Sequence, residues 1–169
     1  MARARFELAP DRSQVWIEGS SSIHPIHATA TGLGGWVALE LARGAVAAKP
    51  KVAGEVRIEV GRLRSGNPLV DAETRRRIDA GTHPEIVGSV IGSTRLASDR
   101  VALTGDLTFR GQTHEVEGEL TLAIVEDGVH LTGTQQFDVR TWGLQPPKIG
   151  LLRVHPTVRV RIEAFAVSA

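Results

Sequence analysis

The sequence has no cysteine and no tyrosine among its 169 residues, and only one methionine, four phenylalanines and three tryptophans. The absence of cysteine excludes disulfide bonds, thiolate metal sites and cysteine nucleophiles. No apolar run reaches the roughly 18 residues that a transmembrane helix needs. Twenty basic residues oppose 19 acidic ones, a net charge of +1. Such a balance predicts no nucleic-acid partner and no stable membrane insertion.

The chain length fits one domain of ordinary size, and we expect residues 1–169 to form it. Residues 1–8 are basic, but no apolar segment and no small-residue cleavage site follow them, as they would in a secretory signal. We therefore expect a cytoplasmic protein.

Glycine and proline are spread along the chain and separate short segments in which apolar and polar residues alternate. Alternation with a period of two is typical of strands that bury one face. The best segments are residues 55–60, 101–110, 114–124 and 158–163, and weaker ones are residues 13–19, 36–41, 85–91 and 129–139. Turn signals at residues 98–100, 110–112 and 126–128 predict hairpins. About eight antiparallel strands follow, closed as a barrel or stacked as a sandwich.

A single segment has the signals of a helix instead. Asn67 is a typical N-cap, Pro68 suits the first helical position, arginines occupy residues 75–77, and Gly81 follows the expected end. Its expected apolar positions are few: Leu69, Ala72 and Ile78. We predict a short helix near residues 68–80, either outside the sheet or across an opening, with its arginines in solvent.

The order of these pieces resembles a known family. The matching segments are residues 13–17, 34–36, 71–79, 83–86, 103–113, 142–148 and 157–163. Together they resemble the YceI-like proteins, the lipocalin-like polyisoprenoid-binding family. The resemblance implies an all-β fold, an eight-stranded antiparallel lipocalin-like barrel with a helical insertion. It also implies an apolar interior that holds an isoprenoid chain, such as a quinone tail or a polyprenyl lipid.

The composition agrees with a hollow interior, because only seven aromatic side chains are available to fill it. We predict a protein that binds, carries or sequesters a long apolar ligand, with no cofactor besides a bound isoprenoid lipid. Alternation assigns these residues to the cavity lining: Val15, Ile17, Val37, Leu39, Ile58, Leu103, Leu107, Phe109, Leu120, Leu122, Val160 and Ile162.

Two histidines, His24 and His27, are the nearest approach to a chemical motif. On a strand this spacing points the two rings to opposite faces, and Pro25 excludes a regular helix. The preferred interpretation is a histidine pair satisfied by backbone groups. Contact with a ligand head group is the first alternative. A metal site would need a third ligand from His83, His114, His130 or a carboxylate, and we predict none.

Trp142 and Lys148 are further candidates for the rim of the barrel, where Lys148 and Arg153 could meet a phosphate or quinone oxygen. The preferred interpretation of this segment is a turn with solvated charges. The sequence has no phosphate loop, dinucleotide fingerprint, nucleophile elbow or zinc-protease motif, so we predict no enzyme. Two alternatives stay open: a filled barrel that binds a protein partner, with a homodimer as one form, and a small enzyme using His24 or His27 as a general acid or base.

Overall fold

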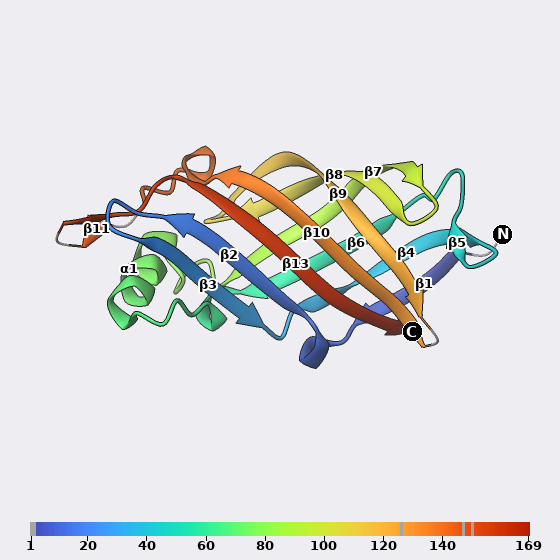
Figure 1. The fold of residues 1–169 in the computed structure, drawn as a ribbon, viewed down its shortest axis with the longest axis horizontal. Coiled ribbons are helices and arrows are strands. Elements are labelled where there is room, and N and C mark those ends of the chain that lie inside the picture. The colour runs from blue at the N-terminus through green and yellow to red at the C-terminus, as the bar shows by residue number, and fades with distance from the viewer. Residues whose placement is uncertain (1–2, 126, 147, 150) are drawn as a thin grey trace.

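The computed structural model describes residues 3–125, 127–146, 148–149 and 151–169. It confirms the expected all-β fold: an eight-stranded antiparallel barrel with one short helix, shown in Figure 1. The barrel strands are β1 (Arg3–Leu8), β2 (Gln14–Ser20), β3 (Pro25–Thr31), β4 (Gly34–Ala42), β6 (Ala53–Glu59), β7 (Glu85–Ala97), β8 (Arg100–Phe109), β9 (Gln112–Val125), β10 (Gly128–Asp138) and β13 (Thr157–Ser168).

Ten strands fill eight places around the barrel because two places are each shared by two strands. The first half of β13 pairs with β2, and its last residues pair with β1, so β1 and β2 follow one another along a single partner. Strands β3 and β4 continue in the same way, since β3 pairs with β2 and β4 with β1. Between β1 and β2 the chain turns through the 3-10 helix η1 (Pro10–Arg12), where proline removes a ladder donor.

Three hairpins connect the long strands β7, β8, β9 and β10, as expected. Ala97 pairs with Arg100, and Phe109 pairs with Gln112, so two-residue turns join these strands. In the second turn Arg110 and Gly111 both have positive φ, 54° and 72°, which is the backbone of a type I′ turn. Val125 and Gly128 pair across the third connection, and Glu126 lies outside the described residues.

Two strands of the barrel, β1 and β3, were not predicted from the sequence. Strand β1 alternates Ala4, Phe6 and Leu8 against charged residues, but we interpreted this segment only as a basic N-terminus. Strand β3 buries mainly alanine on its inner face, so its hydrophobic signal is weak. The remaining elements are the short strands β5 (Ala45–Val46), β11 (Lys148–Ile149) and β12 (Leu152–Arg153), and the 3-10 helices η2 (Val60–Arg62) and η3 (Val139–Trp142).

The expected helix is α1 (Pro68–Ile78), and it begins as predicted. The side chain of Asn67 accepts hydrogen bonds from the backbone N–H groups of Leu69 and Val70. Its end was predicted wrongly: Asp79, not a glycine, takes the left-handed conformation with φ 59° and caps the helix.

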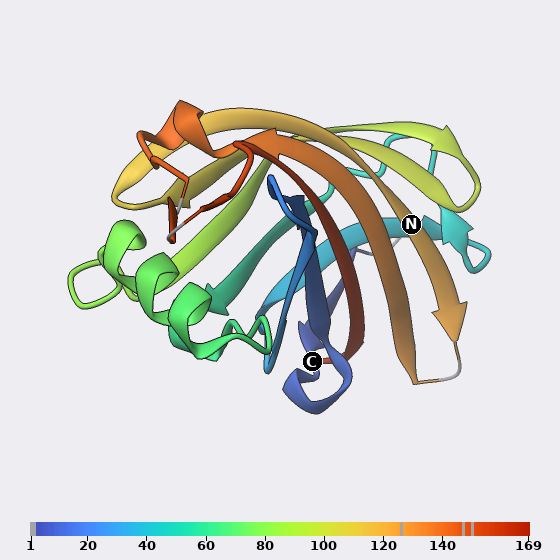
Figure 2. The ribbon, with the colours of Figure 1, turned by 60° about the vertical axis from the view of Figure 1, so that its left-hand side comes forward.

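The buried face of α1 also differs from the prediction. Leu69 is exposed and Val70 is buried, so the helix is turned by one residue from the expected orientation. Ala72 is exposed as well, while Ile78 is buried as expected. Figure 2 shows α1 at the end of the barrel away from both chain termini.

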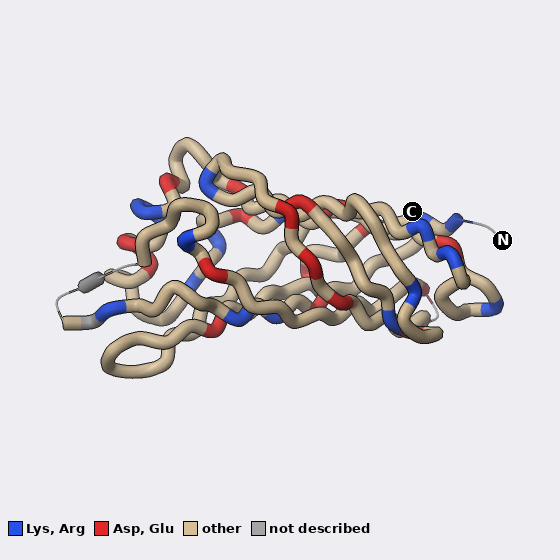
Figure 3. Tube along the Cα trace, turned by 90° about the horizontal axis from the view of Figure 1, so that it is seen from above, with Lys and Arg blue, Asp and Glu red and all other residues tan. Residues whose placement is uncertain are grey.

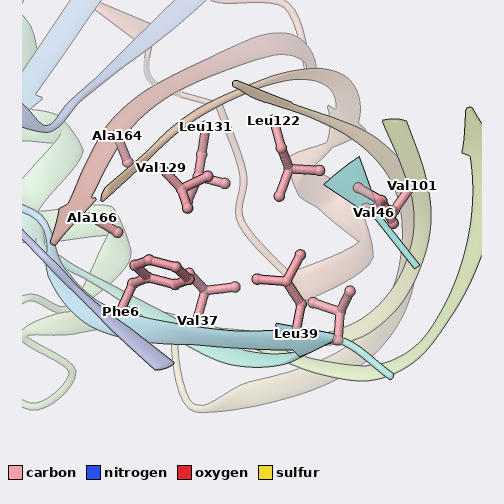
Figure 4. Packing of buried hydrophobic residues seen from close by; sticks show 11 residues of the cluster. Phe6, Val37, Leu39, Val46, Val101, Leu122, Val129, Leu131, Ala164 and Ala166 are labelled. Atoms are coloured by element: carbon pink, nitrogen blue, oxygen red, sulfur yellow. The ribbon is translucent and has the colours of Figure 1, made fainter. Parts of the chain in front are cut away.

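The opposite end of the barrel is closed by packed side chains. Figure 4 shows this cluster, which includes Phe6, Val37, Leu39, Val101 and Leu122. Leu39 and Val101 are completely buried. No helix of the described residues is long and apolar enough to cross a membrane.

Candidate functional site

The barrel contains a cavity of about 480 Å³ between the packed cluster and α1. Its wall comes from the inward-facing residues of the barrel strands, and its volume falls within the range of about 300–1,000 Å³ that is usual for ligand pockets. The inner positions are mainly branched aliphatic residues, which can contact a hydrocarbon but cannot hydrogen-bond with it.

Glycines at inward positions help make the barrel hollow. Along β8 and β9 they take places that the alternating pattern gives to large apolar residues: Gly105 lies between Leu103 and Leu107, and Gly118 lies between Val116 and Leu120. The six glycines of the lining are Gly19, Gly54, Gly88, Gly105, Gly118 and Gly133. None of them adds a side chain to the interior. Gly54 and Gly105 also allow close approach of neighbouring strands, because a Cβ atom there would lie 2.8 and 2.7 Å from the backbone oxygens of Trp36 and Ser89. A Cβ atom placed on Gly118 would meet no heavy atom within 4 Å, so this position faces open space.

This feature was visible in the sequence but was missed. We used the number of aromatic residues to predict whether the barrel is filled. A better indication is whether the glycines of an alternating segment fall on the same face as its apolar residues, which is the phase of the glycines. The positions 105, 118 and 133 share the phase of their apolar neighbours.

Ten of the twelve predicted lining residues border the cavity: Val15, Ile17, Val37, Ile58, Leu103, Leu107, Phe109, Leu120, Val160 and Ile162. The other two, Leu39 and Leu122, also point inward but lie within the packed cluster. Alternation gives the face of each residue, but it does not tell at which height along the barrel the interior becomes packed. The role of all twelve in ligand contact stays a prediction.

Trp142 is buried at the cavity wall, and η3 brings it there. Its indole N–H donates a hydrogen bond to the carbonyl of Leu107 over 3.0 Å. The rings of Phe109, His114 and Phe137 meet it edge-on, with centroids 5.4–6.5 Å apart. This cluster fixes the position of Trp142 beside the ligand space. The side chain of Lys148, the other rim candidate, lies outside the described residues.

Helix α1 contributes a mixed polar and apolar surface to the other end of the cavity. Val70 and Ile78 are buried there, and Asp71, Thr74 and Arg75 border the same space. His155 reaches the lining from the segment after β12. Polar groups of the cavity are therefore available near α1, in contrast to the wholly apolar packed cluster.

An ion-pair network connects α1 to the segment that follows η3. The carboxylate of Glu73 accepts hydrogen bonds from Arg76 and from Arg77, whose Nε lies 2.7 Å away. Arg77 also donates to the carbonyl of Gln145 over 3.4 Å. The hydrogen bonds from Arg76 and Arg77 lower the pKa of Glu73 from its ordinary value to about 2. Glu73 is thus ionised throughout the physiological range and orients Arg77 toward Gln145.

The backbone ladder between β9 and β10 covers only part of the two strands. These strands pair only from Thr121 to Val125 and from Gly128 to Thr132. Beyond this ladder β9 is held by β8, and β10 is held by β13, but the described ladder between β9 and β10 does not continue. The lining includes residues 117–119 and 133–135 of the two separated strand halves.

His24 and His27 lie away from the cavity. Both are exposed; His27 is on the outer face of β3 opposite Glu18, and Nδ1 of His24 is 2.8 Å from the carbonyl of Pro25. The part of the chain that the structure describes contains no group of three His, Asp or Glu side chains placed to hold a metal. The enzyme hypothesis therefore loses the residues on which it depended.

Comparison with known proteins identifies the family. The model of the YceI-like domain matches residues 6–166. The chain belongs to the YceI-like family. No curated protein matches the sequence. The recognition made from the motifs, and the barrel that it implied, are thereby confirmed.

Several solved structures share this YceI-like fold at low sequence identity. BcnA of Burkholderia cenocepacia has 15% identity and a TM-score of 0.77, with 92% of this chain and 96% of that chain covered. A polyisoprenoid binding domain from Saccharophagus degradans has 12% identity and a TM-score of 0.73, with 97% and 98% covered. The YceI protein of Campylobacter jejuni has 12% identity and a TM-score of 0.65, with 84% of each chain covered. At these identities the neighbours show the fold that the family shares.

Proposed function

We propose that this YceI-like barrel binds, carries or sequesters a long apolar ligand of the class of polyisoprenoids, isoprenoid quinones or similar lipids. The observation that carries the proposal is the cavity of about 480 Å³, whose inner wall combines aliphatic side chains with glycines. The structure from Saccharophagus degradans is that of a polyisoprenoid binding domain, which supports the same ligand class. A barrel filled by its own side chains, the alternative considered from sequence, does not fit this cavity.

The distribution of polar groups suggests the orientation of the ligand. A hydrocarbon tail would lie toward the packed cluster around Leu39, which apolar side chains build. A polar head group would lie near Thr74, Arg75 and His155, which border the cavity at the other end. Arg75 has no carboxylate within 4.0 Å in the described part of the chain, so its charge is available to a phosphate or a carbonyl oxygen.

Apolar burial is sufficient for useful affinity. Enclosing about 400 Å² of hydrocarbon contributes on the order of 10 kcal/mol at roughly 25 cal/mol per Å², before the entropic costs of binding. A ligand without hydrogen-bonding groups along its tail leaves no unsatisfied polar atoms in such a wall.

The test combines native mass spectrometry with a substitution that fills the cavity. Protein purified gently from its own host is expected to carry a mass of several hundred daltons that organic solvent releases and that consists of isoprene units. Gly118→Leu should abolish this mass, because the new side chain enters open space in the cavity. Leu107→Trp is a second cavity-filling variant, and both should keep the circular dichroism spectrum of the wild type.

Thr121→Leu is the matched control, since it adds the same side chain to the outer face of the same strand. It should retain the ligand fully. The proposal fails if the wild-type protein stays free of ligand after incubation with excess quinone and polyprenol. It also fails if the folded Gly118→Leu protein carries as much lipid as the Thr121→Leu control.

A further inference from the structure

Three large apolar side chains are strongly exposed at the end of the barrel where α1 lies. Ile23 is 64% exposed, Leu69 is 67% exposed and Leu151 is 90% exposed. They belong to the turn between β2 and β3, to the first turn of α1 and to the turn between β11 and β12, all at this end in Figure 1. Exposed apolar side chains gathered on one surface mark a site of interaction.

The β2–β3 turn and the β11–β12 hairpin are joined directly. The backbone N–H of Ser22 donates to the carbonyl of Arg153 over 2.9 Å, and its hydroxyl donates to the carbonyl of Leu151 over 3.0 Å. Helix α1 is joined to the segment before the hairpin through Arg77 and Gln145. Ile23 and Leu151 therefore project from two joined turns, and Leu69 projects from the helix at the same end of the barrel. We name these three side chains the apolar rim.

The surroundings of the apolar rim are rich in arginine. Residues 20–25, 60–84, 110–111, 139–146, 148–149 and 151–156 build this end, and they contain eight arginines but only three acidic residues, whereas the whole chain has a net charge of +1. Glu59 and Asp138, at the edges of these segments, pair with Arg62 and Arg140. Figure 3 shows basic residues at both ends of the molecule. Near the opposite end Leu96, Ile124 and Val125 are only 40–43% exposed, so the stronger exposure of Ile23, Leu69 and Leu151 distinguishes this end.

Some of these arginines are free to bind an anion. Arg64, Arg75 and Arg153 have no carboxylate within 4.0 Å among the residues that the structure describes. Apolar side chains that enter the interface of a bilayer, together with arginines that attract anionic lipids, are the two components of peripheral membrane binding.

We propose that the apolar rim docks this end of the barrel onto an anionic lipid bilayer, with Ile23, Leu69 and Leu151 entering the interface and Arg64 and Arg153 facing lipid phosphates. Docking in this orientation brings the cavity end bordered by Thr74, Arg75 and His155 toward the bilayer. An apolar ligand could then pass between membrane and cavity with little exposure to water. The docking itself stands on the exposed surface, and only its use for ligand transfer rests on the proposed function.

Sedimentation with vesicles tests the docking directly. Purified protein is mixed with vesicles of phosphatidylcholine alone or with phosphatidylglycerol added, and the bound fraction is measured. Binding is expected only to the anionic vesicles, and it should weaken as salt rises from about 0.05 M to about 0.5 M because the charges become screened. The triple variant Ile23→Ser, Leu69→Ser, Leu151→Ser should lose binding by at least tenfold.

A matched control is available on the barrel wall. Ile91, Leu96 and Ile124 are also exposed apolar residues, but they lie on β7 and β9, outside the apolar rim. Their replacement by serine should leave vesicle binding unchanged. For the charge component, Arg64→Gln with Arg153→Gln should weaken binding severalfold, whereas Arg43→Gln with Lys49→Gln, on either side of β5, should not.

The outcomes separate docking from ligand binding. The proposal is overturned if the wild-type protein ignores anionic vesicles, binds neutral vesicles equally well, or loses binding equally in both triple variants. It is also overturned if the rim variant only converts a dimer into a monomer in sedimentation velocity, which would make the rim a contact between copies. Native mass spectrometry on the same variants reports the cavity independently, so an empty cavity with intact vesicle binding refutes the proposed function alone.

Discussion

The side-chain amide of Gln135 donates a hydrogen bond of 2.7 Å to the backbone carbonyl of Glu117. This contact connects β10 to β9 where their backbone ladder has already ended at Thr132 and Thr121. A side chain thus replaces the backbone pairs that join neighbouring strands elsewhere in the barrel. Gly118, next to Glu117, faces open space in the interior, so this contact joins the two strands at the cavity wall.

Removing this contact should loosen the wall without unfolding the barrel. In Gln135→Ala we expect amide hydrogen exchange at residues 117–120 and 133–137 to become severalfold faster, because no ladder holds these strand halves together. If ligand passes through this wall, its release should become faster as well. The neighbouring Gln136 is on the outer face of β10, so Gln136→Ala is the control. Equal exchange in both variants would mean that Gln135 does not hold the wall.

The two ends of the barrel should respond differently to loss of side-chain volume. Leu39 is completely buried in the packed cluster, so Leu39→Ala is expected to lower the free energy of unfolding by about 2–5 kcal/mol. Leu120 borders the cavity and is only partly buried, so Leu120→Ala should cost at least about 1 kcal/mol less. Urea denaturation of the ligand-free proteins measures both values. Equal losses would show that the interior around Leu120 is packed as tightly as the cluster.

These differences show what alternation can and cannot predict. It places Leu39 and Leu120 on the inner face correctly, because side chains along a strand point to opposite faces in turn. It gives no information on height along the barrel axis, which depends on the stagger between strands. The closed end and the hollow part therefore look alike in sequence unless the phase of glycines such as Gly118 is considered.

Helix α1 shows a second limit. The N-cap Asn67 and Pro68 define its start, because their local chemistry is sufficient to begin a helix. Its orientation depends on tertiary contacts: Val70 packs inward and Leu69 remains in solvent, although both are apolar neighbours. The helix has too few apolar residues for their spacing to predict which of its faces is buried.

Trp142 should report on the cavity by fluorescence. The rings of Trp16 and Trp36 lie under the guanidinium groups of Arg161 and Arg5, at 4.9 and 4.3 Å, whereas buried Trp142 borders the ligand space. In a Trp16→Phe, Trp36→Phe protein we expect a short-chain quinone to quench the emission of Trp142 in a saturable manner. Adding Gly118→Leu to this protein should abolish the saturable quenching. Persistence of the quenching in that variant would place the quinone outside the cavity.

The ion-pair network of α1 predicts that the stability of the fold depends on pH. Arg76 and Arg77 hold the pKa of Glu73 at about 2 in the folded protein, well below its ordinary value of 4.5. A lowered pKa in the folded state means that ionised Glu73 stabilises the fold above pH 4.5, and that this contribution disappears as the pH falls toward 2. Titration of the Glu73 carboxyl carbon by NMR should therefore give a midpoint near pH 2.

The consequence for stability is tested with Glu73→Gln. At pH 7 this variant should melt below the wild type, because Arg77 loses the carboxylate that orients it toward Gln145. As the pH falls from 4.5 toward 2, the melting temperatures should converge, since the wild type then loses the same charge. Glu115→Gln, on the outer face of β9, controls for the loss of a surface carboxylate. A difference between wild type and Glu73→Gln that stays constant down to pH 2 would mean that the Glu73 charge does not fasten the helix to the barrel.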